Sequence, residues 1–296
     1  MDIGIFSAHR ELDSLVSAAR EVAEAGFGSM WTPQIFELDA LTAIAVAARE
    51  VKGLEFGTCV VPTYRQHPMM MAQQALTVSQ ASGGRLSLGI GLSHQVVVEG
   101  MWGLSYDKPL RHMTEFLDVL MPLLKGDAAN AEGETITGRG ELGIPAEEPS
   151  VVLAALGPKM LELAGTVADG TTTWMVGPAT IASHTSPSIQ AAAEAAGREP
   201  ARVVVALPTV VTDDPAGARE RAAKEFEIYG HLPSYRAMLD REGAAGPEDV
   251  AVIGSADEVA ERVSAIFDAG ASTFVAAEFG SSDDVLRTRE ALAALL

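Results

Sequence analysis

The chain has 296 residues but only one cysteine, Cys59. A single cysteine rules out an internal disulfide and a cysteine-based zinc site, and it is typical of a protein in a reducing compartment. No run of about 18 consecutive apolar residues occurs, so we expect no membrane span. The first residues do not have the basic region of a signal peptide, and we therefore expect a cytoplasmic protein.

Basic residues are also scarce, because 21 lysines and arginines stand against 40 aspartates and glutamates, for a net charge of −19. This balance argues against nucleic acid or an anionic membrane surface as a partner, and it favours a soluble protein. The six histidines form no His-x-His or His-Glu-x-x-His pair, so we expect no metal site. No Gly-x-Gly-x-x-Gly sequence opens a helix, which weakens the case for an open dinucleotide-binding sheet.

Hydrophobic residues make up 48% of the chain, and they recur in an ordered pattern. Short apolar runs alternate with stretches of helical spacing, which predicts parallel strands joined by right-handed helical crossovers. Eight such units predict an α/β fold of the (β/α)8 TIM-barrel type, in a single domain over residues 1–296, with a doubly wound open sheet as the alternative. Long connections predict insertions after the fourth and seventh strands. The eight expected strands are residues 3–6, 29–31, 54–61, 86–90, 150–153, 170–175, 203–207 and 273–277.

The fourth of these strands ends in a stretch with several features of a ligand site. Gly89 and Gly91 carry no Cβ, so backbone or a ligand can approach closely there. Ser93 and His94 follow just beyond the carboxyl end of the strand, which is where ligands bind in α/β proteins. A tight turn with a purely structural role is the alternative interpretation.

The fifth strand leads into a helix that begins with Gly157, Pro158 and Lys159. Proline is favoured at the first helical position, and the free N–H groups of the next residues point outward with the positive end of the helix dipole. Lys159, one of only five lysines, adds a full positive charge. The turn is therefore a candidate phosphate site, and the alternative is a well-capped helix with a solvated lysine.

Other chemically distinctive residues favour structural roles. Cys59 lies in an apolar strand without a neighbour that would lower its pKa, so we expect a small buried side chain rather than a nucleophile. His67 precedes a helix and is expected to cap it, whereas His112 lies on a helix and is expected to be solvated. Trp31 and Trp174 end two predicted strands, where each could belong to the core or one could form a wall against a flat ring.

Several segments, in this order along the chain, resemble the luciferase-like monooxygenase family, and within it the oxidoreductases that use coenzyme F420, a 5-deazaflavin. The resemblance implies a (β/α)8 barrel with an insertion, a homodimer, and an oxidoreductase that transfers a hydride between the deazaflavin and a small organic substrate. An FMN-dependent monooxygenase that uses reduced flavin and O2 is the alternative, and a non-catalytic flavin-binding or scaffold protein is a third possibility. The segments are residues 57–63, 65–68, 82–91, 111–117, 156–160, 164–165 and 168–170.

The same resemblance implies a non-proline cis peptide at Cys59-Val60 behind the cofactor ring, and phosphate binding at the loops after the fifth and sixth strands. Some members carry an acidic residue and a histidine after the second strand, where this chain has Pro33-Gln34. Glutamine cannot exchange a proton near neutral pH, so any proton donor must come from elsewhere. The predicted catalytic residues are His9, Gln34 and His94. The predicted cofactor-binding residues are Cys59, Val60, Pro62, Thr63, Gly89, Gly91, Ser93, His94, Ala155, Leu156, Gly157, Pro158, Lys159, Met160, Trp174, Met175, Gly177 and Pro178.

Overall fold

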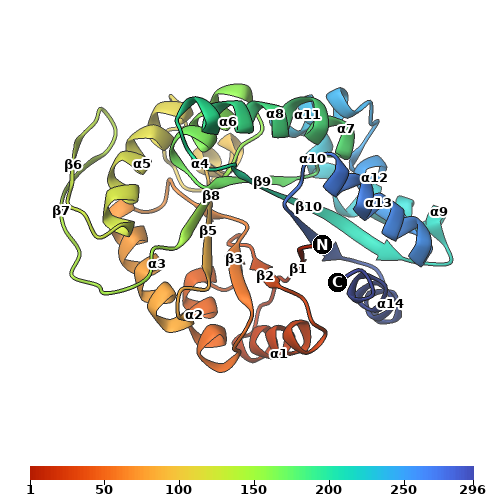
Figure 1. Ribbon diagram of the computed structural model, residues 1–296. Helices are drawn as coiled ribbons and strands as arrows, with labels where there is room; N and C mark the ends of the chain where they lie inside the picture. The colour runs from red at the N-terminus through yellow and green to blue at the C-terminus, as the bar shows by residue number, and fades with distance from the viewer. The chain divides into compact units, whose positions relative to one another are not determined.

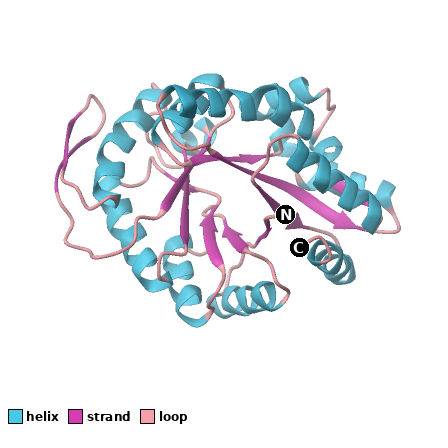
Figure 2. Cartoon of the chain, in the orientation of Figure 1, coloured by secondary structure: helices cyan, strands magenta, loops and turns pink.

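The computed structural model describes all 296 residues of the chain, and most of its strands are followed by a helix (Figures 1 and 2). By their contacts the residues form two compact units. The first unit contains residues 1–7, 20–31 and 155–296, and the second contains residues 8–19 and 32–154. The expectation of one domain over residues 1–296 stays a prediction.

The first unit is built on parallel strands. β10 pairs with β9, β11 and β12, and β1 pairs with β12 and β2. Almost every residue of these strands is buried, as expected for parallel strands with both faces covered. The strands are β1 (Ile3–Phe6), β2 (Ser29–Thr32), β9 (Gly170–Trp174), β10 (Arg202–Val211), β11 (Val252–Gly254) and β12 (Thr273–Glu278).

Helices of the first unit follow these strands, and their starts are set by local sequence. Ser255 and Ser281 each accept a hydrogen bond from the backbone three residues on, in reciprocal capping boxes that begin α13 and α14. Proline opens most of the others, because its missing N–H is not needed in a first turn. The helices are α6 (Pro158–Val167), α7 (Pro178–Thr180), the π-helical turn Ile181–Thr185, α8 (Ser186–Ala195), α9 (Pro215–Glu225), α10 (Glu227–His231), α11 (Pro233–Glu242), α12 (Pro247–Val250), α13 (Ala256–Asp268) and α14 (Ser282–Ala293).

The second unit has its own parallel strands, in which β5 pairs with β3, β4 and β8. A two-stranded antiparallel hairpin, β6 and β7, packs beside α5 (Figure 1). α1 (Leu12–Glu24) contributes residues to both units. The strands are β3 (Glu55–Thr58), β4 (Val61–Pro62), β5 (Leu86–Gly91), β6 (Ala129–Glu132), β7 (Thr137–Gly140) and β8 (Ser150–Ala154). The helices are α2 (Ala40–Glu50), α3 (Pro68–Ser82), α4 (Gln95–Gly100) and α5 (Pro109–Leu124).

The predicted strands are all present, but three details differ. The third strand is split into β3 and β4, because residues 59 and 60 between them leave the regular ladder. The seventh runs over ten residues rather than five, and a short strand, β11, was not predicted. The helical spacing of residues 179–196 predicts one continuous helix, but the π-helical turn interrupts it. No helix is both long and apolar enough to cross a lipid bilayer.

Candidate functional site

In the second unit, the carboxyl ends of β3 and β5 are joined through Thr58 and Gly89. The Thr58 hydroxyl donates to the Gly89 carbonyl oxygen at 2.7 Å and accepts the Gly89 N–H at 2.8 Å. A Cβ at position 89 would lie 1.8 Å from the Thr58 carbonyl oxygen, and one at Gly91 would lie 2.8 Å from the Val60 side chain. The protein itself therefore fills the space beside both glycines, which agrees with a structural role, and their contact with a cofactor stays a prediction.

The predicted cis peptide is present between Cys59 and Val60. Just after it, Pro62 pairs with Gly91, and the Thr63 N–H donates to the Gly91 carbonyl oxygen at 2.9 Å. The structure thus brings together five of the predicted cofactor-binding residues: Cys59, Val60, Pro62, Thr63 and Gly91. Cys59 is only half-buried, so the expectation of a buried thiol is wrong: the side chain belongs to the irregular link between two strands rather than to a regular strand.

His112 was predicted to be solvated, but it is buried, with 8% of its surface exposed. The sequence prediction therefore did not include it among the site residues. Its Nε2 lies 3.1 Å from the Thr63 hydroxyl, and its ring stacks on Tyr64 at 4.0 Å and 3°. Burial holds the pKa of His112 below its ordinary value, although the Glu115 carboxylate opposes this shift. His112 lies four residues before the buried Phe116, so both are on one face of α5. This spacing is the sequence feature that could have predicted its burial.

Lowering the pH should destabilise the protein through His112. Because folding keeps this imidazole neutral below its ordinary pKa of 6.5, the unfolded chain binds the proton more readily. Stability should therefore fall as the pH drops below about 6.5. We expect His112→Gln, which can still hydrogen-bond Thr63, to lose less melting temperature between pH 7.5 and 5.5 than the parent. The exposed His231→Gln is the matched control and should match the parent, and equal losses in all three proteins would contradict the argument.

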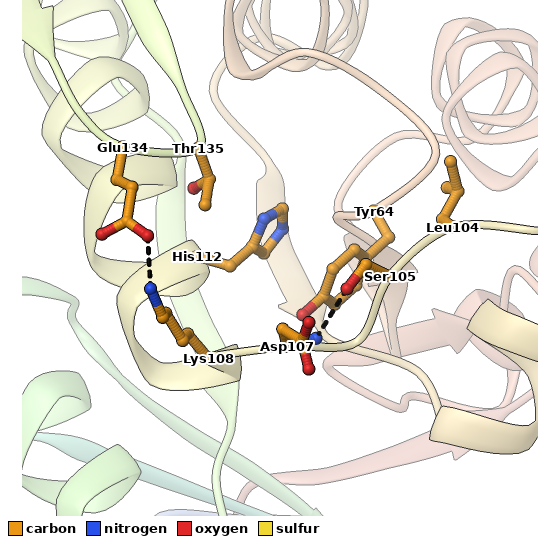
Figure 3. Close-up of a pocket in the computed structure, with 8 residues that line it drawn as sticks. All are labelled: Tyr64, Leu104, Ser105, Asp107, Lys108, His112, Glu134 and Thr135. Carbon is orange, nitrogen blue, oxygen red and sulfur yellow. Dashed lines mark hydrogen bonds and ion pairs between the residues drawn. The ribbon is translucent and has the colours of Figure 1, made fainter.

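The Tyr64 and His112 side chains also line a cavity of about 350 Å³ (Figure 3). The Tyr64 hydroxyl is buried without a hydrogen-bond partner, and burial together with Tyr106 and Asp107 raises its pKa to about 12. Lys108 pairs with Glu134 across the rim (Figure 3). Charges of both signs therefore line the cavity, and it contains none of the predicted site residues. The lining residues are Tyr64, Leu104, Ser105, Asp107, Lys108, His112, Glu134 and Thr135.

The three predicted catalytic residues all belong to the second unit. Gln34 uses its side-chain oxygen to accept the Ala40 N–H at 3.2 Å at the start of α2, which is a structural contact. His9 is half-buried after β1. His94 precedes α4 without capping it, and burial lowers the pKa of its imidazole. Ser93, just before it, has a left-handed backbone with φ of 63°, which is uncommon for a residue with a side chain.

In the first unit, α6 begins with an open turn. Gly157 is the residue before the helix and Pro158 the first residue in it, and no side chain caps this end. No atom lies within 4 Å of a Cβ built at Gly157, so the space beside it is free. His184 Nε2 lies 2.8 Å from the Leu156 carbonyl oxygen and holds the turn, while Lys159 is exposed. Ala155 is buried behind the turn, and Met160 is half-buried in the first turn of the helix.

The second predicted phosphate turn, Gly177-Pro178, differs from the first. The Glu242 carboxylate accepts the N–H groups of Ala179 and Thr180 at 3.0 and 2.6 Å. A Cβ at Gly177 would lie 2.3 Å from the same carboxylate. The amides at this helix start therefore already bind an anionic group of the protein. The sequence could not show this, because Glu242 is more than 60 residues away along the chain.

The two strand-end tryptophans have different environments. Trp31 is completely buried, and its indole N–H donates to the Ser29 hydroxyl at 2.9 Å, so it belongs to the core. Trp174 is half-buried, and its indole nitrogen is enclosed without any hydrogen-bond partner. Met175, directly after it, has a left-handed φ of 56°. Such backbone in a non-glycine residue often marks a functional site.

Comparison with known proteins identifies relatives of this chain. Residues 1–273 match the family model of luciferase-like monooxygenases. The 5,10-methylenetetrahydromethanopterin reductase of Methanolobus tindarius is 28% identical over 212 residues, which are 71% of this chain and 64% of the reductase. The match thus spans less than two thirds of that relative's length.

Solved structures share the fold. The coenzyme F420-dependent tetrahydromethanopterin reductase of Methanopyrus kandleri has a TM-score of 0.83 and 19% identity, covering 99% of this chain and 97% of that one. The oxygenating constituent of 3,6-diketocamphane monooxygenase from Pseudomonas putida, in complex with FMN, has a TM-score of 0.79 and 18% identity, covering 99% and 96%. These similarities confirm the predicted closed barrel of eight parallel strands with helices outside. With this fold, and with a family match over residues 1–273, the chain belongs to the luciferase-like monooxygenase family.

Proposed function

We propose that this chain is a coenzyme F420-dependent oxidoreductase that transfers a hydride between the deazaflavin and a small organic substrate. Relatives described as tetrahydromethanopterin reductases, one of them named for its F420 dependence, support this assignment. The bound cofactor would supply the hydride chemistry, and the protein would bind and orient it. The structural observation that supports a phosphate-bearing cofactor is the open, uncapped turn at Gly157, and the relatives favour F420 as that cofactor.

The residues of this turn fit a phosphate group. The N–H of Lys159 lies in the first turn of a ten-residue helix whose dipole favours an anion, and no side chain occupies the space beside Gly157. The Lys159 ammonium adds attraction in a chain that is otherwise strongly acidic. Among the two predicted phosphate turns, we therefore assign the phosphate to residues 157–160, because Glu242 already holds the amides after Gly177.

The strand ends of the second unit fit a flat ring. Val60, Pro62 and Thr63 are held in place by contacts with Gly91, and His112 fixes the Thr63 hydroxyl from behind. A wall held this firmly would orient a ring without much loss of side-chain entropy. His94 is kept neutral by burial near pH 7, so it would accept a proton before it could donate one.

A flavin-dependent monooxygenase is the second candidate function. The structural similarity to a monooxygenase component in complex with FMN favours it. Both FMN and F420 carry a phosphate, so the Gly157 turn serves either cofactor. The two candidates differ in the reaction, because the monooxygenase consumes O2 and the F420 enzyme does not.

Cofactor titration separates these candidates. We expect purified protein to bind F420 at least about tenfold more tightly than FMN, a difference of about 1.4 kcal/mol. The measurement is the dissociation constant of each cofactor from its own absorbance or fluorescence. Tighter binding of FMN, together with O2 consumption in the presence of reduced FMN, would replace the proposal by the second candidate.

We also propose that the protein is a homodimer in a reducing, cytoplasmic compartment. The family resemblance supports the dimer, as does α3, which exposes Met70 to 52% although most of this helix is apolar. The chain has a single cysteine, in keeping with a reducing compartment. Sedimentation velocity at micromolar concentration should give about twice the mass of one chain, and a monomer would contradict the dimer.

A further inference from the structure

The indole N–H of Trp174 is buried and has no hydrogen-bond acceptor. Buried polar groups in proteins are nearly always hydrogen-bonded, so an exception needs an explanation, such as a ligand that supplies the partner. Trp31, in the same unit, shows the ordinary outcome, because its N–H donates to the Ser29 hydroxyl at 2.9 Å. An indole N–H is a donor only, and the missing partner must therefore be an acceptor.

Aromatic rings surround Trp174. Its ring stacks on Phe6 with centroids 5.8 Å apart and planes 21° apart. Phe226 and Tyr229 meet it edge-on, each at 5.9 Å, with interplanar angles of 78° and 73°. Phe279 supports Phe226 from behind at 5.9 Å. We call Phe6, Trp174, Phe226 and Tyr229 the aromatic wall.

The aromatic wall lies where a parallel barrel binds its ligands. Phe6 is the last residue of β1 and Trp174 is the last residue of β9, so both stand at carboxyl ends of strands. Phe226 and Tyr229 come from the insertion after β10, at and within α10, a helix with no buried residue. All four side chains of the wall are half-buried rather than enclosed in the core.

The charges near the aromatic wall disfavour an anionic ligand. Glu225 and Glu227 flank Phe226 in the sequence and are exposed. Arg236, on the next helix, is already engaged by the Asp240 carboxylate and by backbone carbonyls. An uncharged molecule therefore suits this surface, and its apolar ring would gain contact with the aromatic side chains.

We propose that the aromatic wall binds the substrate, and that it selects an uncharged molecule with a hydrocarbon ring and an acceptor atom placed to receive the Trp174 N–H. This inference rests on the proposed function, because it names the substrate class of that oxidoreductase. The sequence predicted that Trp174 contacts the cofactor, whereas this inference assigns Trp174 to the substrate. Three rings already pack around the indole, and only its N–H group lacks a partner.

The test uses three ring probes that differ in one group. Acetophenone carries a ring and an acceptor, ethylbenzene carries the ring alone, and benzoate carries the ring and a negative charge. Their dissociation constants are measured by ligand-observed NMR with the parent, Trp174→Phe and Trp102→Phe. Trp102 is the matched control, because it belongs to the second unit and lies beneath Arg65.

We expect Trp174→Phe to weaken acetophenone about three- to tenfold, the effect of one hydrogen bond, and to leave ethylbenzene unchanged. Trp102→Phe should change neither probe, and benzoate should bind the parent most weakly of the three. Equal losses for acetophenone and ethylbenzene, or tighter binding of benzoate, would overturn the inference. Phe226→Leu is a second variant that keeps the donor, and it should weaken acetophenone and ethylbenzene alike.

Titration of the same variants with F420 separates this inference from the proposed function. A parent protein that does not bind F420 overturns the proposed function, whatever the ring probes show. If Trp174→Phe weakens F420 but leaves acetophenone unchanged, Trp174 contacts the cofactor and the inference is overturned. Unchanged F420 affinity with weakened acetophenone supports the assignment of Trp174 to the substrate.

Discussion

Gly157→Asp should weaken F420 binding by about 100-fold or more while the melting temperature stays unchanged or rises slightly. Nothing lies within 4 Å of a Cβ at this position, and the backbone, with φ of −81° and ψ of 155°, accepts any residue. Aspartate is also a favoured residue before a helix, where its charge stabilises by about 0.3–1 kcal/mol. The fold should therefore tolerate the change, whereas a phosphate would meet a like charge and lose donors worth about 1.5–3 kcal/mol each.

Gly157→Asn is the matched control, because it has nearly the same shape without the charge. It should weaken F420 much less than the aspartate variant, and Lys159→Ala should also be milder because the backbone donors remain. The measurements are F420 dissociation constants and melting temperatures for all four proteins. If the aspartate variant binds F420 as tightly as the parent, the phosphate lies elsewhere and the assignment of this turn is wrong.

The fold could be predicted from the sequence because its signals are local and repeated. Each strand is a short apolar run, and each crossover helix carries its own start and stop residues, such as the glycine at position 83 with its left-handed φ of 66°. Because the strand-helix pattern occurs eight times, an error of a few residues in the bounds of one strand does not change the predicted architecture. The boundaries of the seventh strand were less predictable, because its last residues pair with β11, a strand of only three residues between two helices.

The site was harder to predict because its decisive contacts join residues far apart in the chain. Gly89 and Gly157 look alike in the sequence, since each is a glycine at or just beyond the carboxyl end of a strand. In the structure, Gly89 is pressed against the Thr58 carbonyl, 31 residues away, whereas Gly157 faces open space. Glu242 likewise closes the turn at Gly177 from a distant helix. No local pattern carries this information.

His112 is a second example of a site residue whose environment depends on distant parts of the chain. Its polar side chain predicts exposure on a helix, yet the structure buries it against Tyr64 and gives its Nε2 the Thr63 hydroxyl. Its spacing relative to Phe116 places His112 on the apolar face of the helix. Burial of its ring nitrogen would cost free energy without a hydrogen-bond partner. That partner belongs to the loop after β4, so the role of His112 follows from tertiary structure.

Gly89→Ala should be the most destabilising single-methyl change tested in this chain. The new Cβ would lie 1.8 Å from the Thr58 carbonyl oxygen, and this oxygen belongs to the backbone, which cannot rotate away. β3 and β5 must then separate, which also strains the two hydrogen bonds between the Thr58 hydroxyl and Gly89. We expect a loss of about 3 kcal/mol or more, and a melting temperature lower by about 6–10 °C.

Gly143→Ala isolates this effect, because it adds the same methyl group at a glycine with no atom within 4 Å of the new Cβ. Its backbone is not in the left-handed region, so the alanine should change stability by no more than about 0.5 kcal/mol. Thermal unfolding of the two variants and the parent gives the comparison directly. A Gly89→Ala protein that melts together with Gly143→Ala would mean that β3 and β5 can move apart at little cost. The strand ends that we assign to the cofactor ring would then not be the rigid wall that the proposed function requires.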